Sequence, residues 1–162
     1  MTRLPALGPR GEGWLAAQLG LILFVGYAPQ LDGAPAWGGS TATLTAVLGT
    51  ALGALGVALA VTAAWQLAEA RALTALPLPR AHGELVRAGA YRYVRHPIYS
   101  GIELAAIDWG LAHGSPMALL GAAALFTVLA MKAAREEAWL AARYPDYAAY
   151  RLRTKRLIPG LY

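Results

Sequence analysis

Two short polar segments contain most of the residues whose types and spacing could support chemistry. In the first, Arg95 and His96 precede Pro97, a residue that suits the first turn of a helix. The backbone amides of a helix start favour anions, so Arg95 and His96 would lie beside an anion-binding terminus. In the second, the adjacent carboxylates of Glu136 and Glu137 follow an apolar stretch. If both segments lie at one membrane face, they could hold a zwitterionic ligand that also carries a positive centre.

The sequence excludes or leaves unsupported several other chemistries. The chain has no cysteine, which excludes disulfides, thiolate nucleophiles and cysteine-ligated zinc or iron–sulfur clusters. No glycine-rich loop follows an expected strand, so neither a dinucleotide-binding fingerprint nor a Walker loop is predicted. The three histidines lack the paired spacing of a zinc-binding helix, and we expect no metal site.

The polar segments alternate with apolar stretches that approach the length of a membrane span. Of the 162 residues, 57% are hydrophobic and 14% are charged, whereas an ordinary soluble domain has about 25% charged residues. Four stretches come near the roughly 20 residues that a spanning helix needs, namely residues 14–28, 44–68, 98–112 and 116–133. The first is expected to stop at Pro29 and the Asp32-Gly33-Ala34-Pro35 turn. A short connection makes the last two a tight hairpin. We therefore predict an all-α polytopic membrane protein with about four transmembrane helices and a C-terminal cytoplasmic helical segment.

The placement of the basic residues predicts an orientation. All 14 lysines and arginines fall on one side of the four-span arrangement, where Arg3 and Arg10 precede the first span and the others lie between spans two and three or at and after the end of span four. By the positive-inside rule both termini are expected in the cytoplasm, and we expect a bacterial inner-membrane protein. Because orientation explains the net charge of +5, we expect membrane lipids and not nucleic acid as partners. The oligomeric state is left open.

The N-terminal region has a second interpretation. Arg3, Arg10, the apolar stretch and Ala34-Pro35-Ala36 also resemble a cleaved signal peptide, although cleavage would leave an odd number of spans. We favour a single membrane-embedded domain over residues 1–162, made of a two-span hairpin (1–70), a cytoplasmic loop (71–97), and a second hairpin with the C-terminal segment (98–162). Gly49 and Gly53 in the second span have GxxxG spacing, which is typical of helices that pack closely. The partner helix could belong to the same bundle or to a second copy in a homodimer.

The two polar segments resemble the isoprenylcysteine carboxyl methyltransferase family, which belongs with the phospholipid N-methyltransferases among integral membrane enzymes that use S-adenosylmethionine (SAM). The resemblance covers roughly the last 75 residues in order and spacing, while the first two spans match only as hydrophobic helices. It is carried by Arg95-His96-Pro97-x-Tyr99-x-Gly101, Glu136-Glu137-x-x-Leu140, Tyr147-x-x-Tyr150 and Arg156-Leu157-Ile158-Pro159.

The resemblance implies a SAM site and assigns residues to it. Arg95, His96, Tyr99 and Gly101 fall on one wall of the cofactor site of similar enzymes, Glu136 and Glu137 on paired SAM-binding glutamates, and Tyr147, Tyr150 and Arg156 on a segment that covers the pocket. The residue types suit these roles, because arginine and histidine bind carboxylates, glutamate binds hydroxyls or ammonium, and tyrosine stacks on adenine or faces a sulfonium. Each residue alone also fits a simpler role, as an interfacial anchor or in a surface ion pair.

Two further carboxylates lie within the third apolar stretch. Glu103 and Asp108 would be buried in the membrane, where carboxylates are unfavourable and indicate function. Similar family members usually carry apolar residues there. Glu103 and His96 are the candidate catalytic residues, because an amine or thiol acceptor must lose a proton. A structural hydrogen bond to a neighbouring helix is the alternative for both carboxylates.

We therefore predict SAM-dependent methyl transfer to a lipophilic or membrane-associated acceptor, which could be an isoprenylcysteine-type carboxylate, a lipid amine or a small thiol. Two alternatives stay open. Some membrane sterol reductases have a similar C-terminal half and use NADPH, although they are longer and have more spans. A non-catalytic membrane scaffold would keep the motif without the activity.

Overall fold

The computed structural model describes residues 5 and 7–162, so Arg3, one of the charges used to predict the orientation, lies outside the described residues. Five α-helices make up the fold: α1 (Glu12–Asp32), α2 (Gly39–Glu69), α3 (Pro97–Ala112), α4 (Pro116–Arg143) and α5 (Tyr147–Arg153). A short 3-10 helix, η1 (Gly89–Arg92), precedes α3. The described residues form no strand beyond an isolated bridge between Val94 and Lys155, and the predicted all-α class is confirmed.

Local sequence explains where two of the helices begin. α3 starts at Pro97 and α4 at Pro116, as predicted, because proline has a preset φ and its missing N–H is not needed in the first turn. The side-chain oxygen of Ser115 caps α4 by accepting a hydrogen bond from Ala118 N at 3.0 Å. The same hydroxyl donates to the carboxylate of Asp32, which ties the end of α1 to the start of α4.

Two helices extend beyond the predicted apolar stretches. α1 continues through Pro29 to Asp32, where the predicted turn begins. A proline this close to the end of a helix removes one hydrogen bond, and the contact with Ser115 holds the last turn. α4 continues beyond the predicted end at residue 133 to Arg143, because residues 134–143 are mostly strong helix formers although they are no longer apolar. Glu136 and Glu137 therefore lie inside α4.

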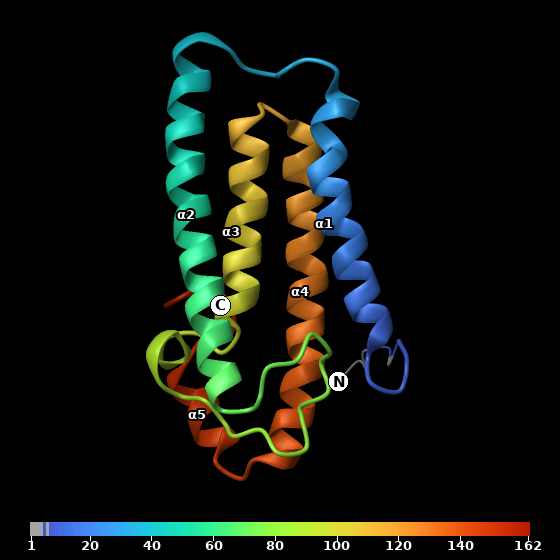
Figure 1. The fold of residues 1–162 in the computed structure, drawn as a ribbon, viewed down its shortest axis with the longest axis vertical. Coiled ribbons are helices and arrows are strands. Elements are labelled where there is room, and N and C mark those ends of the chain that lie inside the picture. The colour runs from blue at the N-terminus through green and yellow to red at the C-terminus, as the bar shows by residue number, and fades with distance from the viewer. Residues whose placement is uncertain (1–4, 6) are drawn as a thin grey trace.

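Glycines allow α2 and α3 to pack closely, and Figure 1 shows the two helices side by side. A Cβ atom at Gly56 would lie 2.6 Å from the carbonyl oxygen of Gly101, and one at Gly49 would lie 2.9 Å from Asp108 Oδ1. Only glycine fits at such distances, and close approach of this kind is typical of helices in membranes. The spaced glycines of α2 thus serve packing within the bundle.

The outer surface of the bundle is apolar. Leu23 on α1 is 74% exposed, and Val47 on α2 is 64% exposed. α1, α2 and α4 are long and apolar enough to cross a membrane, which is consistent with an integral membrane protein. α3 has 16 residues, a length of about 24 Å at 1.5 Å per residue.

Polar segments gather at one end of the bundle. In Figure 1 the long connection between α2 and α3 lies at the same end as α5, opposite the connection between α1 and α2. The chain after α5 pairs with the chain before α3, because Arg95 N donates to the carbonyl of Lys155 at 2.8 Å and His96 N to that of Arg156 at 3.1 Å. The C-terminal segment is thereby fixed against the start of α3.

Alanine at Gly56 and at Gly20 provides a matched test of this packing. A Cβ atom at Gly20 would meet nothing within 4 Å. We expect Gly56→Ala to lower the free energy of unfolding by about 1–3 kcal/mol, because the added atom forces α2 away from α3. Gly20→Ala should leave it unchanged or raise it by up to about 1 kcal/mol. Thermal unfolding of the purified protein in detergent compares the two, and equal midpoints would contradict the close packing.

Candidate functional site

A buried carboxylate joins three segments at the polar end of the bundle. Glu137 on α4 has a side chain that is 4% exposed and accepts a hydrogen bond from Arg95 Nε at 2.8 Å. Beyond α5, Arg156 donates to the same carboxylate through Nε at 3.1 Å and Nη2 at 3.0 Å. This two-pronged contact is both strong and directional, and it raises the pKa of Arg156. Glu137 therefore anchors the start of α3 and the C-terminal segment to α4.

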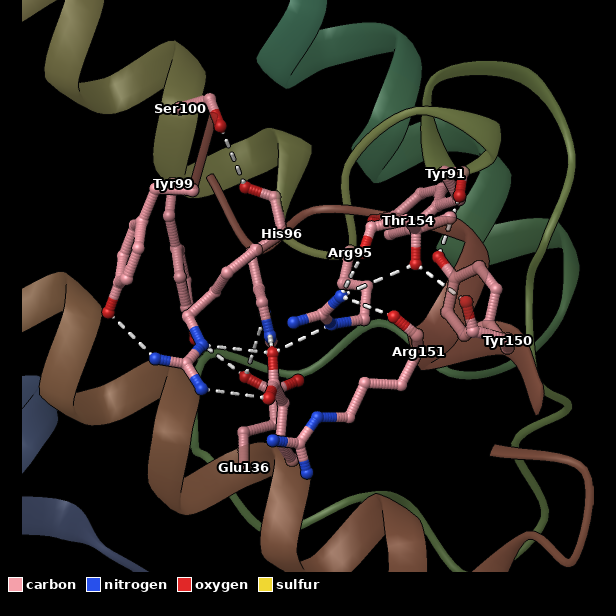
Figure 2. Close-up of polar contacts among 12 residues, drawn as sticks. Tyr91, Arg95, His96, Tyr99, Ser100, Glu136, Tyr150, Arg151 and Thr154 are labelled. Atoms are coloured by element: carbon pink, nitrogen blue, oxygen red, sulfur yellow. Dashed lines mark hydrogen bonds and ion pairs between the residues drawn. The ribbon is translucent and has the colours of Figure 1, made fainter. Parts of the chain in front are cut away.

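Arg95 extends this anchor to the end of α5. Its Nη1 atom donates to the backbone carbonyls of Thr154 at 2.5 Å and Arg151 at 3.3 Å, and Figure 2 shows the guanidinium lying among these groups. Carbonyls at a helix C-terminus lack intrahelical partners and carry partial negative charge. Much of the hydrogen-bonding capacity of Arg95 is thus used within the protein.

Glu136 has a different environment from Glu137, because successive helical residues point about 100° apart. Its Oε2 atom accepts a hydrogen bond from the Tyr99 hydroxyl at 2.9 Å and lies 3.7 Å from His96 Nδ1. The His96 ring stacks on that of Tyr99, with centroids 5.3 Å apart, and its Nε2 atom lies 3.3 Å from Glu137 Oε1. His96 is therefore placed between the two carboxylates, near Tyr99 and Glu136 in Figure 2.

These side chains line a cavity of about 510 Å³, which is within the range of about 300–1,000 Å³ typical of ligand sites. All five α-helices and the connection between α2 and α3 contribute to its wall. The predicted cofactor residues in this wall are Arg95, His96, Tyr99, Glu136, Tyr147 and Tyr150. Glu137 and Arg156 lie behind the wall in contact with one another, and Gly101 packs against Gly56.

One polar atom in the cavity wall, the hydroxyl of the buried Tyr147 side chain, lacks a hydrogen-bond partner among the described residues. His96 Nε2 already faces Glu137 Oε1 at 3.3 Å. Burial raises the pKa of Tyr147, so its hydroxyl stays a neutral donor. By contrast, the hydroxyl of Tyr150 donates to the carbonyl of Tyr91 at 2.7 Å. Buried polar groups are nearly always paired, so the unpaired hydroxyl of Tyr147 indicates that a ligand completes this wall.

Sequence reasoning missed several residues of the cavity. Lys132 lies one turn before Glu136 on α4, and this i,i+4 spacing is a signal that could have found it. Gln18 is a polar residue within an apolar helix, which also indicates a special role. The loop residues that line the cavity show no spacing pattern, so only the folded structure identifies them.

The carboxylates of α3 lie away from the cavity wall. Asp108 packs against the glycines of α2. Glu103 Oε2 is buried and has no hydrogen-bond partner in the described part of the chain. Neither residue lines the cavity, whereas His96 does. The catalytic role of Glu103 therefore stays a prediction without geometric support from the cavity.

Comparison with models of protein families matches residues 44–147 to the family described as phospholipid methyltransferase. The match spans more than half of the chain, from α2 to the first residue of α5, and includes both polar segments up to Tyr147. No curated protein and no solved structure matches the chain.

Glutamine at each of the two glutamates separates anchoring from cavity lining. Glu137→Gln leaves Arg95 and Arg156 without their counter-charge, and we expect the free energy of unfolding to fall by about 3 kcal/mol or more. Glu136→Gln keeps an acceptor for the Tyr99 hydroxyl, so it should change the free energy of unfolding by less than about 1 kcal/mol. Thermal unfolding in detergent measures both variants. Equal destabilisation would show that the two carboxylates do not have separate roles.

Proposed function

The chain belongs to the phospholipid methyltransferase family, and on that premise we propose that it transfers a methyl group from SAM to a lipophilic or membrane-delivered acceptor. The observation that carries the proposal is the cavity at the polar end of the bundle. Its wall combines the carboxylate of Glu136, the imidazole of His96 and buried tyrosine rings. A carboxylate and aromatic faces attract a sulfonium cation, and aromatic rings also stack on adenine.

The residues present fit this cofactor. Glu136 would accept hydrogen bonds from the ribose hydroxyls or from the ammonium group of SAM. The Tyr147 hydroxyl would gain the hydrogen-bond partner that it lacks. Glu137 and Arg95 would act as positioning residues, since their mutual contact holds His96 and α5 in place.

Arg156 and Gly101 would support the site without touching the cofactor. Arg156 completes the anchor at Glu137, and Gly101 lets α3 approach α2. The remaining cofactor residues, Tyr99 and Tyr150, would offer ring faces at the cavity wall.

Bound SAM supplies an electrophilic methyl carbon, to which the acceptor lone pair forms a bond as the carbon–sulfur bond breaks and its electrons stay on sulfur. The contribution of the protein is to align the acceptor behind that carbon and to exclude water. A carboxylate acceptor needs no base. An amine or thiol acceptor must lose a proton. His96 lies in the cavity wall, where its imidazole could accept that proton.

An apolar groove at the side of the bundle suits a lipophilic acceptor. The groove has a volume of about 370 Å³ and lies between α1 and α3. Ile102 lines both the groove and the polar cavity. A hydrocarbon chain in the groove would therefore bring its polar end towards Glu136. The groove is lined by Ile22, Val25, Gly26, Ile102, Ala105, Ala106, Trp109 and Leu125.

We place the polar end of the bundle in the cytoplasm of a bacterial cell, with α3 as a short fourth span. The arginines of the connection between α2 and α3 support this orientation, since basic loops stay on the cytoplasmic side. SAM made in the cytoplasm would then reach the cavity without crossing the membrane.

Calorimetric titration of SAM into the purified full-length protein in detergent tests the proposal. We expect micromolar binding that Glu136→Ala weakens at least tenfold, because the variant removes the cavity carboxylate. Glu69→Ala is the matched control. Glu69 accepts a hydrogen bond from Trp65 at the surface of α2, outside the cavity, and its variant should bind SAM unchanged.

A parallel titration with NADPH decides between the alternatives. Binding of NADPH alone would assign the protein to the reductase class. Binding of neither cofactor by folded protein would contradict the proposed enzyme and favour a scaffold.

A further inference from the structure

Lys132 is a buried cation that makes no ion pair within 4.0 Å in the described part of the chain. Its side chain is almost fully buried on α4, 1% of the residue surface being exposed. The ammonium group donates to Gln18 Oε1 at 2.5 Å and to the carbonyl of Ala75 at 2.9 Å, and both acceptors are neutral. No carboxylate oxygen of the described residues lies within 4.0 Å of it. Glu136, one turn along α4, attracts the ammonium from a distance but does not touch it. Buried charges are normally paired, so this ammonium lacks an anion in direct contact.

The contacts around Lys132 hold its ammonium group in the cavity wall. Gln18 and Ala75 line the same cavity, and the Tyr99 ring lies 5.0 Å from Nζ. An ammonium group has three N–H donors, and the two neutral acceptors take two of them. One donor and the full positive charge are left for a ligand.

Lys132 lies at the end of the cavity nearest the apolar groove. It is one turn deeper in α4 than Glu136, away from α5 and its tyrosines. It packs near Tyr99, and Ile102, which lines both spaces, lies on the next turn of α3. If an amphiphile lies with its hydrocarbon chain in the groove, its polar group would therefore lie near the ammonium of Lys132.

We propose that Lys132, held by Gln18 and the Ala75 carbonyl, binds an anionic oxygen of the methyl acceptor. The ligand class is an amphiphile that carries a carboxylate or a phosphate next to its hydrocarbon chain. The proposal rests on the function proposed above, and it assigns the two ends of the cavity to two ligands. The tyrosine-rich end takes the cofactor, and the Lys132 end takes the acceptor headgroup.

The test measures binding of two anionic probes to the full-length protein in neutral detergent micelles. N-acetyl-S-farnesylcysteine supplies a carboxylate and dodecyl phosphate supplies a phosphate, so the preferred probe identifies the anion. We expect Lys132→Met to weaken binding of the preferred probe at least tenfold and to leave the Kd of SAM within twofold. Lys132→Arg keeps the charge and should retain most of the affinity.

A second variant keeps the proposal testable if Lys132→Met does not fold. Gln18→Glu places a carboxylate against the ammonium, and the resulting ion pair should exclude the probe and weaken its binding at least tenfold while the thermal midpoint is kept. Gln30→Glu, at an exposed position of the same helix, is the matched control and should bind the probe unchanged.

Two results would overturn the proposal. Wild-type protein that binds neither anionic probe has no anion site at Lys132. A Lys132→Met variant that loses SAM at least tenfold but keeps the probe would assign the lysine to the carboxylate of the cofactor. If the wild-type protein binds a probe but does not bind SAM, the result contradicts the proposed function and supports the anion site.

Discussion

The ion pairs of Glu137 join the start of α3 and the C-terminal segment to α4. Helix packing places α3 beside α4, and backbone hydrogen bonds pair the chain after α5 with the chain before α3. Arg95 and Arg156 lie on these two paired stretches and reach the same carboxylate of α4. In a poorly solvated environment each of these pairs depends on the others, because removal of one partner leaves a buried charge. The anchor thereby supports α5, whose tyrosines line the cavity.

The helical arrangement explains how two neighbouring glutamates take on different tasks. Glu137 is saturated by two guanidinium groups, so it has little capacity for a ligand. Glu136 faces the cavity with one hydrogen bond from Tyr99. His96 lies between the two carboxylates, with Nδ1 3.7 Å from Glu136 Oε2 and Nε2 3.3 Å from Glu137 Oε1. The anchor therefore sets the position of the group that would meet a ligand, and a change at Glu137 acts on the cavity through His96.

The sequence predicted those features that depend on neighbouring residues. Pro97 and Pro116 marked helix starts correctly, since proline acts within a single turn. The prediction from hydropathy placed the end of α4 too early, because residues with high helix propensity extend the helix beyond the apolar stretch. At Pro29 the cause is different, because a tertiary contact from Ser115 holds the last turn of α1. At that position a distant residue supplies the deciding interaction, which no local rule can predict.

Most of the cavity depends on contacts between distant residues, which local sequence patterns do not predict. Tyr99 and Glu136 were predicted as members of one site, and their side chains do meet at 2.9 Å. The loop that closes the cavity is held by contacts from α4 and the residue after it, such as the Tyr144 hydroxyl bonded to the carbonyl of Gly83 at 2.6 Å. Such bonds use backbone groups, which every residue possesses, so no residue type reveals them.

The position of the polar cavity follows from the surrounding medium. Backbone and charged groups that stay unpaired in the apolar layer are strongly unfavourable, so irregular chain gathers at the ends of the helices. α1 and α4 bring Gln18 and Lys132 together, and the amide satisfies the ammonium but does not neutralise it. The carboxylate of Glu136, one turn away, acts on this charge without touching it, so an anion in direct contact would have to come from a ligand. The apolar groove shares Ile102 with the cavity, and an amphiphile lying in it could deliver that anion.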